Sequence, residues 1–208
     1  MKKVLIYGSG GHGKVVLDIL LSAGEKDIAG FVDDSPGKAG QEINGYPVLG
    51  TLSQITDNKD NYQVALGIGD NKIREKTYLK ARDLGFEVVQ AVHPTAVVSQ
   101  NVEMGEGVVV MPGAVVNANT VLGNGVVVNT GATVDHDCNL EQFSQVWPGA
   151  NLAGTVHLGE YSYVGTGAAI IQSINIGKNV IVGAGAVVIS DIPDNVTAVG
   201  MPAKVKER

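Results

Sequence analysis

The 208-residue sequence lacks the features that mark secreted, membrane-bound and nucleic-acid-binding proteins. Its single cysteine, Cys138, cannot form an internal disulfide, which suits a reducing compartment. No apolar run near the start is long enough for a signal peptide or a membrane span. The formal net charge of −6 argues against the basic surface that binds nucleic acid. We therefore expect a cytoplasmic protein that binds neither membranes nor nucleic acids.

Aliphatic residues recur at every sixth position through half of the chain. Val, Leu, Ile or Met occupies all seventeen such positions from Val92 to Val188. A strict hexapeptide period is typical of a β-helix, and the 3.6-residue period of an amphipathic helix is absent. From Met104 to Val188, a small or aliphatic residue stands two positions before each of these aliphatics, Cys138 among them. It commonly follows Gly, Asn or Asp, which tolerate the positive φ of a tight turn. The pattern predicts about five three-sided coils, stacked at roughly 4.8 Å.

The first ninety residues lack this hexad and alternate predicted strands with predicted helices. Such alternation implies an α/β domain with a parallel sheet. The strands are expected at Lys3–Tyr7, Ile28–Val32, 64–69 and 87–91, and the helices at 14–22 and 71–84. We therefore divide the chain into an α/β domain at 1–90, a β-helix at 91–190 and a C-terminal tail at 191–208.

A glycine-rich turn follows the first predicted strand. Gly8, Gly10 and Gly13 have the spacing of a dinucleotide fingerprint, and Asp33 lies twenty residues further on. Glycines let a phosphate approach the backbone at a helix N-terminus, and the acid can bind a ribose or a base. A dinucleotide usually spans two βαβ halves, whereas this domain has room for one, a half-Rossmann unit. That size favours the nucleotide of a sugar nucleotide over a nicotinamide cofactor, with a turn that binds nothing as a third reading.

The β-helix carries one cluster of ionisable residues, Asp135-His136-Asp137. Histidine suits general-base catalysis because its ordinary pKa of about 6.5 lies near working pH. A neighbouring carboxylate, from Asp137 or from Asp135, could set its tautomer. An ordinary surface histidine would give the same sequence. The spacing of His93, His136 and His157 does not suit a three-histidine zinc site, so no catalytic metal is expected.

Together these motifs resemble the hexapeptide-repeat acyltransferases and, within them, the nucleotide-amino-sugar acetyltransferases. That group includes the bacillosamine-pathway enzyme and the sialic acid O-acetyltransferases. The resemblance implies a left-handed parallel β-helix and a homotrimer with acetyl-coenzyme A (acetyl-CoA) in the groove between neighbouring helices. It extends over nearly the whole chain, through Gly-Ser-Gly-Gly-His-Gly-Lys-Val-Val at 8–16, Phe-Val-Asp-Asp at 31–34, Gly-Ile-Gly-Asp-Asn at 67–71 and Val-Gly-Met-Pro-Ala-Lys at 199–204.

The resemblance also implies roles for individual residues. His136 would be the general base and Asp137 the acid that orients it, where the family usually has Glu. Gln145 stands where the family often has a second histidine at the acetyl end of acetyl-CoA. The residues implied to bind the nucleotide sugar are Gly10, Gly11, His12, Asp33, Asp34 and Gly69. Those implied to line the acetyl-CoA groove are Gln145, Gly154, Thr166, Gly183 and Ala184.

The activity expected from these residues is acetyl-CoA-dependent N-acetylation of the 4-amino group of a nucleotide-linked 4-amino-4,6-dideoxy sugar, with UDP as the expected nucleotide. The amine would attack the thioester directly, without an acyl-enzyme. The same base could instead serve O-acetylation of sialic acid or a related glycan precursor. A trimer that binds a sugar nucleotide without catalysis, and an NAD-linked enzyme, are the remaining alternatives.

Overall fold

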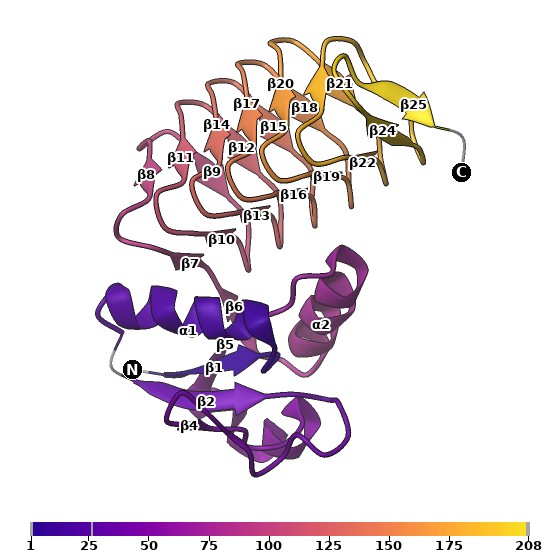
Figure 1. The fold of residues 1–208 in the computed structure, drawn as a ribbon. Coiled ribbons are helices and arrows are strands. Elements are labelled where there is room, and N and C mark those ends of the chain that lie inside the picture. Colours follow the sequence, from indigo (N-terminus) through magenta and orange to yellow (C-terminus); the bar gives the residue numbers. More distant parts are fainter. Residues whose placement is uncertain (1, 26, 207–208) are drawn as a thin grey trace. The chain divides into compact units, whose positions relative to one another are not determined.

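The structure is a computed structural model that describes residues 2–25 and 27–206. The chain forms two compact units, Met1–Val92 and His93–Arg208. Figure 1 shows helices and a small sheet in the first unit and stacked coils of short strands in the second. The boundary predicted at residue 90 lies two residues before this division. Within the described ranges, no helix has the length and apolar character needed to cross a membrane.

The first unit is built on a four-stranded sheet in which all strands are parallel, in the order β2-β1-β5-β6. Its helices follow β1 and β5, so each lies in a crossover between parallel strands. This confirms the predicted α/β unit. The elements are β1 (Lys3–Tyr7), α1 (Gly11–Ser22), β2 (Ile28–Val32), β5 (Tyr62–Leu66), α2 (Asn71–Asp83), β6 (Glu87–Val89) and β7 (Ala91–Val92).

The sheet is buried as parallel sheets usually are. Residues 4–7 of β1 and 64–66 of β5 are all buried, and each forms a near-continuous apolar run. Leu5, Leu66 and Phe86 belong to one buried cluster on this sheet. The sheet core therefore fixes the carboxyl ends of the strands, from which the glycine-rich turn leaves.

Four details of this unit differ from the sequence prediction. The strand expected at 64–69 is β5, which begins at Tyr62 and already ends at Leu66, so residues 67–69 belong to the loop that follows it. Helix α1 begins at Gly11 rather than at residue 14, so the end of the glycine-rich turn forms the first helical turn. The segment between β2 and β5 contains a hairpin of β3 (Glu42–Ile43) and β4 (Tyr46–Pro47), followed by the 3-10 segment η1 (Leu52–Asn61). The predicted strand at 87–91 is two strands, β6 and β7.

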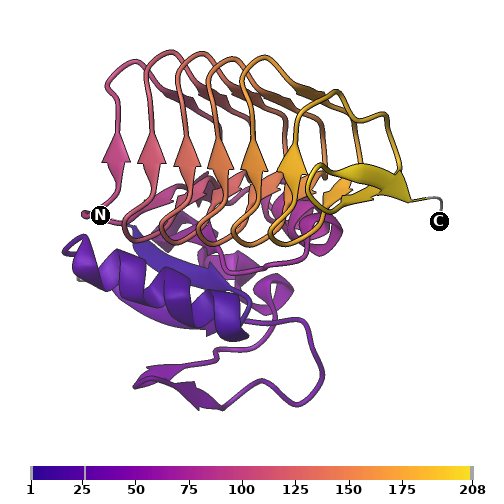
Figure 2. The same cartoon turned by 45° about the horizontal axis from the view of Figure 1, so that its top comes forward.

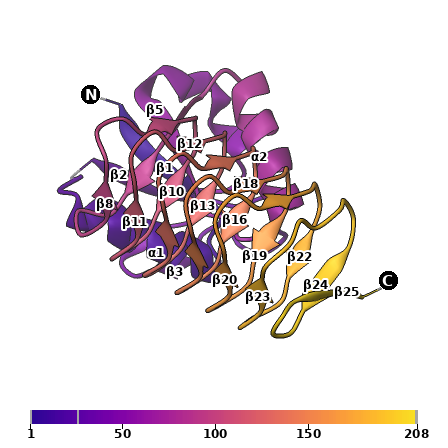
Figure 3. The same cartoon turned by 90° about the horizontal axis from the view of Figure 1, so that it is seen from above.

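The second unit is a parallel β-helix, as the hexad predicts. Strands eighteen residues apart pair in parallel, so that Val116, Val134 and Leu152 lie in adjacent coils and all point into the core. Figure 2 shows one face as a row of arrows that point the same way, and Figure 3 shows the coils following one another along the axis.

Each coil has three short strands, one on each face of the helix. The first face runs β10-β13-β16-β19-β22-β24-β25, the second β8-β11-β14-β17-β20-β23 and the third β9-β12-β15-β18-β21. The strand bounds are β8 (Val97–Val98), β9 (Glu103–Met104), β10 (Val109–Val110), β11 (Val115–Val116), β12 (Val121–Leu122), β13 (Val127–Val128), β14 (Thr133–Val134), β15 (Asn139–Leu140), β16 (Gln145–Val146), β17 (Asn151–Leu152), β18 (His157–Leu158), β19 (Tyr163–Val164), β20 (Ala169–Ile170), β21 (Asn175–Ile176), β22 (Ile181–Val182), β23 (Val187–Val188), β24 (Thr197–Val199) and β25 (Lys204–Lys206).

The β-helix is longer than the predicted five coils, because the second face has six strands. Strands continue into residues 191–208, which the sequence assigns to a tail. Ile181 pairs with Thr197, sixteen residues later, and Ile176 with Ile192, also sixteen later. The last coil is therefore two residues short of the regular eighteen. This coil ends in β25, which pairs antiparallel with β24.

Candidate active site

The glycine-rich turn forms the N-terminus of α1 in the first unit. Gly10 is the N-cap residue, and it offers no side chain to the free N–H groups of the first turn. The first turn also contains no acidic residue. A Cβ on Gly13 would collide with the carbonyl oxygen of Gly8, so the helix packs directly on the turn. This end of α1 therefore has backbone donors suited to an anion such as phosphate.

His12 lies in this first turn and has a buried ring nitrogen. Its Nε2 atom has no hydrogen-bond partner among the described residues. Burial, reinforced by the charge of Arg74, lowers the pKa of His12 to about 4, so the ring is neutral near pH 7. Buried polar atoms are rarely left unpaired, and those that are require an explanation such as a bound ligand. His12 thus adds a side-chain nitrogen to the backbone donors of the turn.

Asp33 follows β2 and is tied to the glycine-rich turn. Its Oδ2 accepts hydrogen bonds from the backbone N of Ser9 at 2.9 Å and from Ser9 Oγ at 2.6 Å, while Oδ1 accepts from the backbone N of Ser35 at 2.9 Å. Burial raises the pKa of Asp33, but these hydrogen bonds outweigh it and bring the pKa to about 2. The ionised carboxylate fixes the turn, a role that the sequence did not predict.

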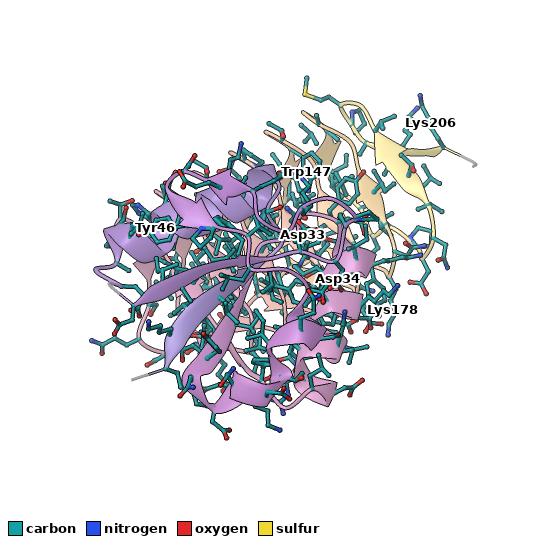
Figure 4. All side chains as sticks on the ribbon, turned by 90° about the horizontal axis from the view of Figure 1, so that it is seen from below. Asp33, Asp34, Tyr46, Trp147, Lys178 and Lys206 are labelled. Atoms are coloured by element: carbon teal, nitrogen blue, oxygen red, sulfur yellow. The ribbon has the colours of Figure 1, made fainter. Side chains whose placement is uncertain are left out.

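Asp34 points to another set of partners, and Figure 4 labels it beside Asp33. Its Oδ2 accepts from Tyr7 Oη at 2.5 Å and from Lys80 Nζ at 2.6 Å. Burial raises the pKa of Asp34, and the hydrogen bonds from Lys80 and Tyr7 more than reverse this. Burial and the bond to Asp34 in turn raise the pKa of Tyr7, which keeps its hydroxyl proton.

Asp33 and Asp34 both line a cavity of about 240 Å³ at the carboxyl end of the sheet. Its cationic residues, Lys76 and Lys80, come from α2, a helix that no sequence motif connects with the site. One turn separates Lys76 from Lys80 on that helix. The lining residues are Tyr7, Gly8, Asp33, Asp34, Ser35, Ile68, Ile73, Lys76, Thr77 and Lys80.

Gly69 lies in the loop after β5, close to His12. A Cβ built on Gly69 would be 3.9 Å from the Cβ of His12. Its carbonyl oxygen accepts a hydrogen bond from Nη1 of the fully buried Arg74 at 2.9 Å, and Arg74 Nη2 donates to Asn71 Oδ1 at 2.8 Å. Arg74 therefore shapes the loop after β5. The first unit brings together the predicted residues Gly10, Gly11, His12, Asp33, Asp34 and Gly69.

In the second unit, His136 lies at the turn between β14 and β15. Its Nδ1 is 2.7 Å from Oδ2 of Asp137, which has a positive φ of 58°. The hydrogen bond from His136 and a second one from Asn119 lower the pKa of Asp137, which is therefore ionised and can only accept. Nδ1 consequently carries the proton, and Nε2 keeps the lone pair that can accept one.

The adjacent Asp135 binds different partners. Its Oδ1 accepts from Asn117 Nδ2 at 2.8 Å and from the backbone N of His136 at 2.8 Å. Asp135 therefore acts on the ring only through its charge. The hydrogen bond that His136 donates to Asp137, followed by the charge of Asp135, raises the pKa of His136 above its ordinary value. The side chain of His136 is 57% exposed, so its Nε2 can be reached from solvent.

Gly154 lies one coil beyond His136, directly against its ring. A Cβ built on Gly154 would be 2.6 Å from Cε1 and 2.7 Å from Nε2 of His136. The backbone N of Thr155 donates to the carbonyl oxygen of His136 at 2.9 Å and joins the two coils there. The absence of a side chain at Gly154 therefore provides the space in which the imidazole lies.

The remaining predicted groove residues lie elsewhere on the β-helix. Thr166 and Ala184 share another corner, after β19 and β22, where the backbone N of Gly185 donates to the carbonyl oxygen of Thr166 at 2.9 Å. Gln145 is in β16 and is only 4% exposed. The β-helix thus brings His136 together with Gly154, and Thr166 together with Ala184, but on different corners. Among the described residues, no group of three or more His, Cys, Asp or Glu side chains is placed to hold a metal ion.

Comparisons with known proteins agree with this architecture. Residues 3–81 match the PglD N-terminal domain family. A curated relative, UDP-N-acetylbacillosamine N-acetyltransferase of Bacillus subtilis, is 36% identical over 117 residues, which are 53% of this chain. The chain therefore matches about half, 52%, of that relative's length.

Two solved structures match over nearly their full lengths. A variant of GDP-perosamine N-acetyl transferase from Caulobacter crescentus, in complex with CoA and GDP-perosamine, is 43% identical with a TM-score of 0.94, covering 100% of this chain and 98% of that one. The acetyltransferase domain of PglB from Neisseria gonorrhoeae, in complex with acetyl coenzyme A, is 41% identical with a TM-score of 0.91, covering 99% of each chain. The chain therefore belongs to the hexapeptide-repeat family of nucleotide-amino-sugar acetyltransferases.

Proposed function

We propose that the protein transfers the acetyl group of acetyl-CoA to the 4-amino group of a nucleotide-linked 4-amino-4,6-dideoxy sugar, with UDP as the expected nucleotide. The observation that carries this proposal is the exposed His136, whose Nδ1 is held by Asp137 at 2.7 Å. It leaves Nε2 available as a base in a chain that is 43% identical to a GDP-perosamine N-acetyl transferase. GDP is the alternative nucleotide, because that relative was solved with GDP-perosamine.

The first unit would bind the nucleotide part of the substrate. Its support is the uncapped N-terminus of α1 with the unpaired Nε2 of His12, which together suit the diphosphate. The adjacent cavity, lined by Asp34 and Lys80 among others, offers both acceptors and donors to the nucleoside. Both carboxylate oxygens of Asp33 accept hydrogen bonds from Ser9 or Ser35, so we propose that Asp33 stabilises the turn.

The second unit would carry out the transfer. The sugar amine attacks the thioester carbonyl carbon of acetyl-CoA while Nε2 of His136 takes a proton from the amine. The resulting tetrahedral intermediate collapses, the C–S bond breaks, and the CoA sulfur leaves with the proton that His136 returns. Asp137 stabilises the imidazolium that forms between these steps. General-base catalysis of this kind contributes about 10²–10⁴-fold to the rate.

The positions of the groove residues support a site shared between subunits of a homotrimer. His136 and Gly154 lie on one corner of the β-helix, whereas Thr166 and Ala184 lie on another. The two corners follow different faces of the β-helix, so these residues face different sides of one subunit. A neighbouring copy would supply the second corner, and Gln145, whose amide can donate to a thioester carbonyl, would belong to this shared groove.

The test is an acetyl-transfer assay with a panel of sugar nucleotides. Purified protein is incubated with acetyl-CoA and UDP-, GDP- or dTDP-linked 4-amino-4,6-dideoxy sugars, and free thiol release is followed against a control without sugar. We expect rapid release with one nucleotide and a product whose new bond is an amide. An ester product, which mild base would cleave, would instead indicate O-acetylation. Nucleotide binding without release of the CoA thiol in the presence of any of these amino sugars would contradict the proposed reaction.

A further inference from the structure

Asn119 lies one coil before Asp137 and contacts its carboxylate. Its Nδ2 donates to Oδ1 of Asp137 at 3.1 Å, while Oδ2 of the same carboxylate accepts from His136 Nδ1 at 2.7 Å. Both Asn119 and Asp137 occupy turns with positive φ, 60° and 58° respectively. The two oxygens of Asp137 are therefore divided between an asparagine and the imidazole.

We infer that Asn119 is a positioning residue for the His136–Asp137 pair, because it fixes the carboxylate rotation in which Oδ2 faces the ring. This inference rests on the proposed role of His136 as the base. The side chain of Asp137 is 50% exposed, so water competes for both of its oxygens. A second fixed contact removes rotational freedom that the carboxylate would otherwise keep in solvent. Partners that orient a catalytic side chain in this way commonly affect function about 10–100-fold in metal sites.

The surroundings of His136 make the effect measurable. Asp135 and Asp137 are the charged side chains that act on its ring. The coil before it presents the neutral Asn117 and Asn119, and the coil after it presents the neutral Gly154 and Thr155. A change in the titration of His136 therefore reports on one of the two carboxylates. Asn119 contacts Asp137, whereas Asn117 contacts Asp135.

Asn119→Gly is a suitable variant because glycine is normal at this turn position. Gly113 and Gly125 occupy the same place in the neighbouring hexads, with φ of 68° and 64°. The change removes the amide donor without imposing backbone strain. Asn179→Gly is the matched control. Asn179 also has a positive φ, 54°, and its Nδ2 donates to Asn195 Oδ1 at 3.0 Å. It lies in the turn between β21 and β22, whereas His136 lies between β14 and β15.

Two measurements on these variants test the inference. In steady-state assays, Asn119→Gly is expected to lower kcat by about tenfold and to move the acid limb of the pH–rate profile to lower pH, with KM for acetyl-CoA little changed. In NMR titrations, the imidazole signal of His136 is assigned by its absence from His136→Ala. Asn119→Gly is expected to lower the pKa that this signal reports. Asn179→Gly should resemble the wild type in both measurements.

The outcomes separate this inference from the proposed function. The inference is overturned if Asn119→Gly leaves both kcat and the His136 titration at wild-type values. It is also overturned if both glycine variants lose activity equally, since that would show a purely structural role. Should the wild type acetylate no amino sugar, the proposed function fails, while the NMR titration still decides whether Asn119 controls the His136–Asp137 pair.

Discussion

Replacing Gly154 with alanine is expected to abolish most activity without unfolding the protein. The added Cβ would be 2.6 Å from Cε1 of His136, whereas carbon atoms in contact are ordinarily about 3.5 Å or more apart. The ring must therefore retreat by about 1 Å, away from the position in which Nδ1 binds Asp137. A misplacement of this size near the reacting atoms can cost about 10²-fold in rate. Because Gly154 does not have a positive φ, alanine fits its backbone.

The assay compares four proteins: wild type, Gly154→Ala, His136→Ala and the double variant. We expect kcat to fall about 10²-fold in Gly154→Ala, with a melting temperature close to that of the wild type. If Gly154 acts through the ring, then adding Gly154→Ala to His136→Ala should change kcat little further. Full activity in Gly154→Ala, or an equal loss in both backgrounds, would refute this reasoning.

Three further outcomes follow from the ionisable groups and the buried thiol. Because the pKa of His136 is raised, its neutral form is lost as pH falls through a value above the ordinary 6.5, and kcat should fall there on the acid side of the pH–rate profile. Asp137→Asn should lower kcat and move this acid limb to lower pH. Ser9→Ala removes one bond to Asp33 and should lower the free energy of unfolding of the first unit by about 1.5–3 kcal/mol in urea titrations at neutral pH. The folded pKa of Asp33, about 2, lies below its ordinary value of 3.8, so this loss should shrink as pH falls from 3.8 to below about 2. A loss independent of pH would contradict the role of Asp33. Cys138 is 1% exposed and burial raises its pKa, so a thiol reagent should label it only after denaturation. Rapid labelling of the native protein would show that the core of the β-helix opens around Cys138.

The hexad predicted the β-helix because the core of a β-helix accepts only aliphatic residues, or only small or aliphatic ones, at each inward position. Val116, Val134 and Leu152 are buried as the period requires, and the turn positions have the positive φ that glycine and asparagine accept. The period could not predict the last coil, because Ile192 pairs with Ile176 after sixteen residues rather than the regular eighteen. This shorter spacing takes the strands after Val188 out of the six-residue period, although Ala198 still packs inward with 1% exposure.

The first unit was predicted less completely because its short elements carry no periodic signal. The hairpin of β3 and β4 has two residues in each strand, and η1 has a kink at Asn58. The start of α1 was misplaced because Gly11 and Gly13, poor helix formers, lie in its first turn. There the close packing of Gly13 on the carbonyl oxygen of Gly8 outweighs helix propensity.

The candidate site could be predicted in part from the eighteen-residue coil. That spacing places Gly154 one coil after His136 and Asn119 one coil before Asp137, so both contacts could have been found by counting. The sequence could not show that Asp137 rather than Asp135 meets the ring, because the choice depends on the direction of each side chain. In the first unit, no local pattern indicated Lys80, since its contact with Asp34 joins residues 46 positions apart.

The central claim, that His136 is the base in direct acetyl transfer to a sugar amine, is tested most directly by one comparison. Wild type and His136→Ala are mixed with acetyl-CoA and the amino-sugar nucleotide that the panel identifies, and the rates of thiol release and amide formation are measured together. We predict equal rates of both in the wild type, no acetylated protein, and a loss of about 10²–10⁴-fold in the folded variant. Nearly full turnover by His136→Ala, or an acetylated protein intermediate, would contradict the account.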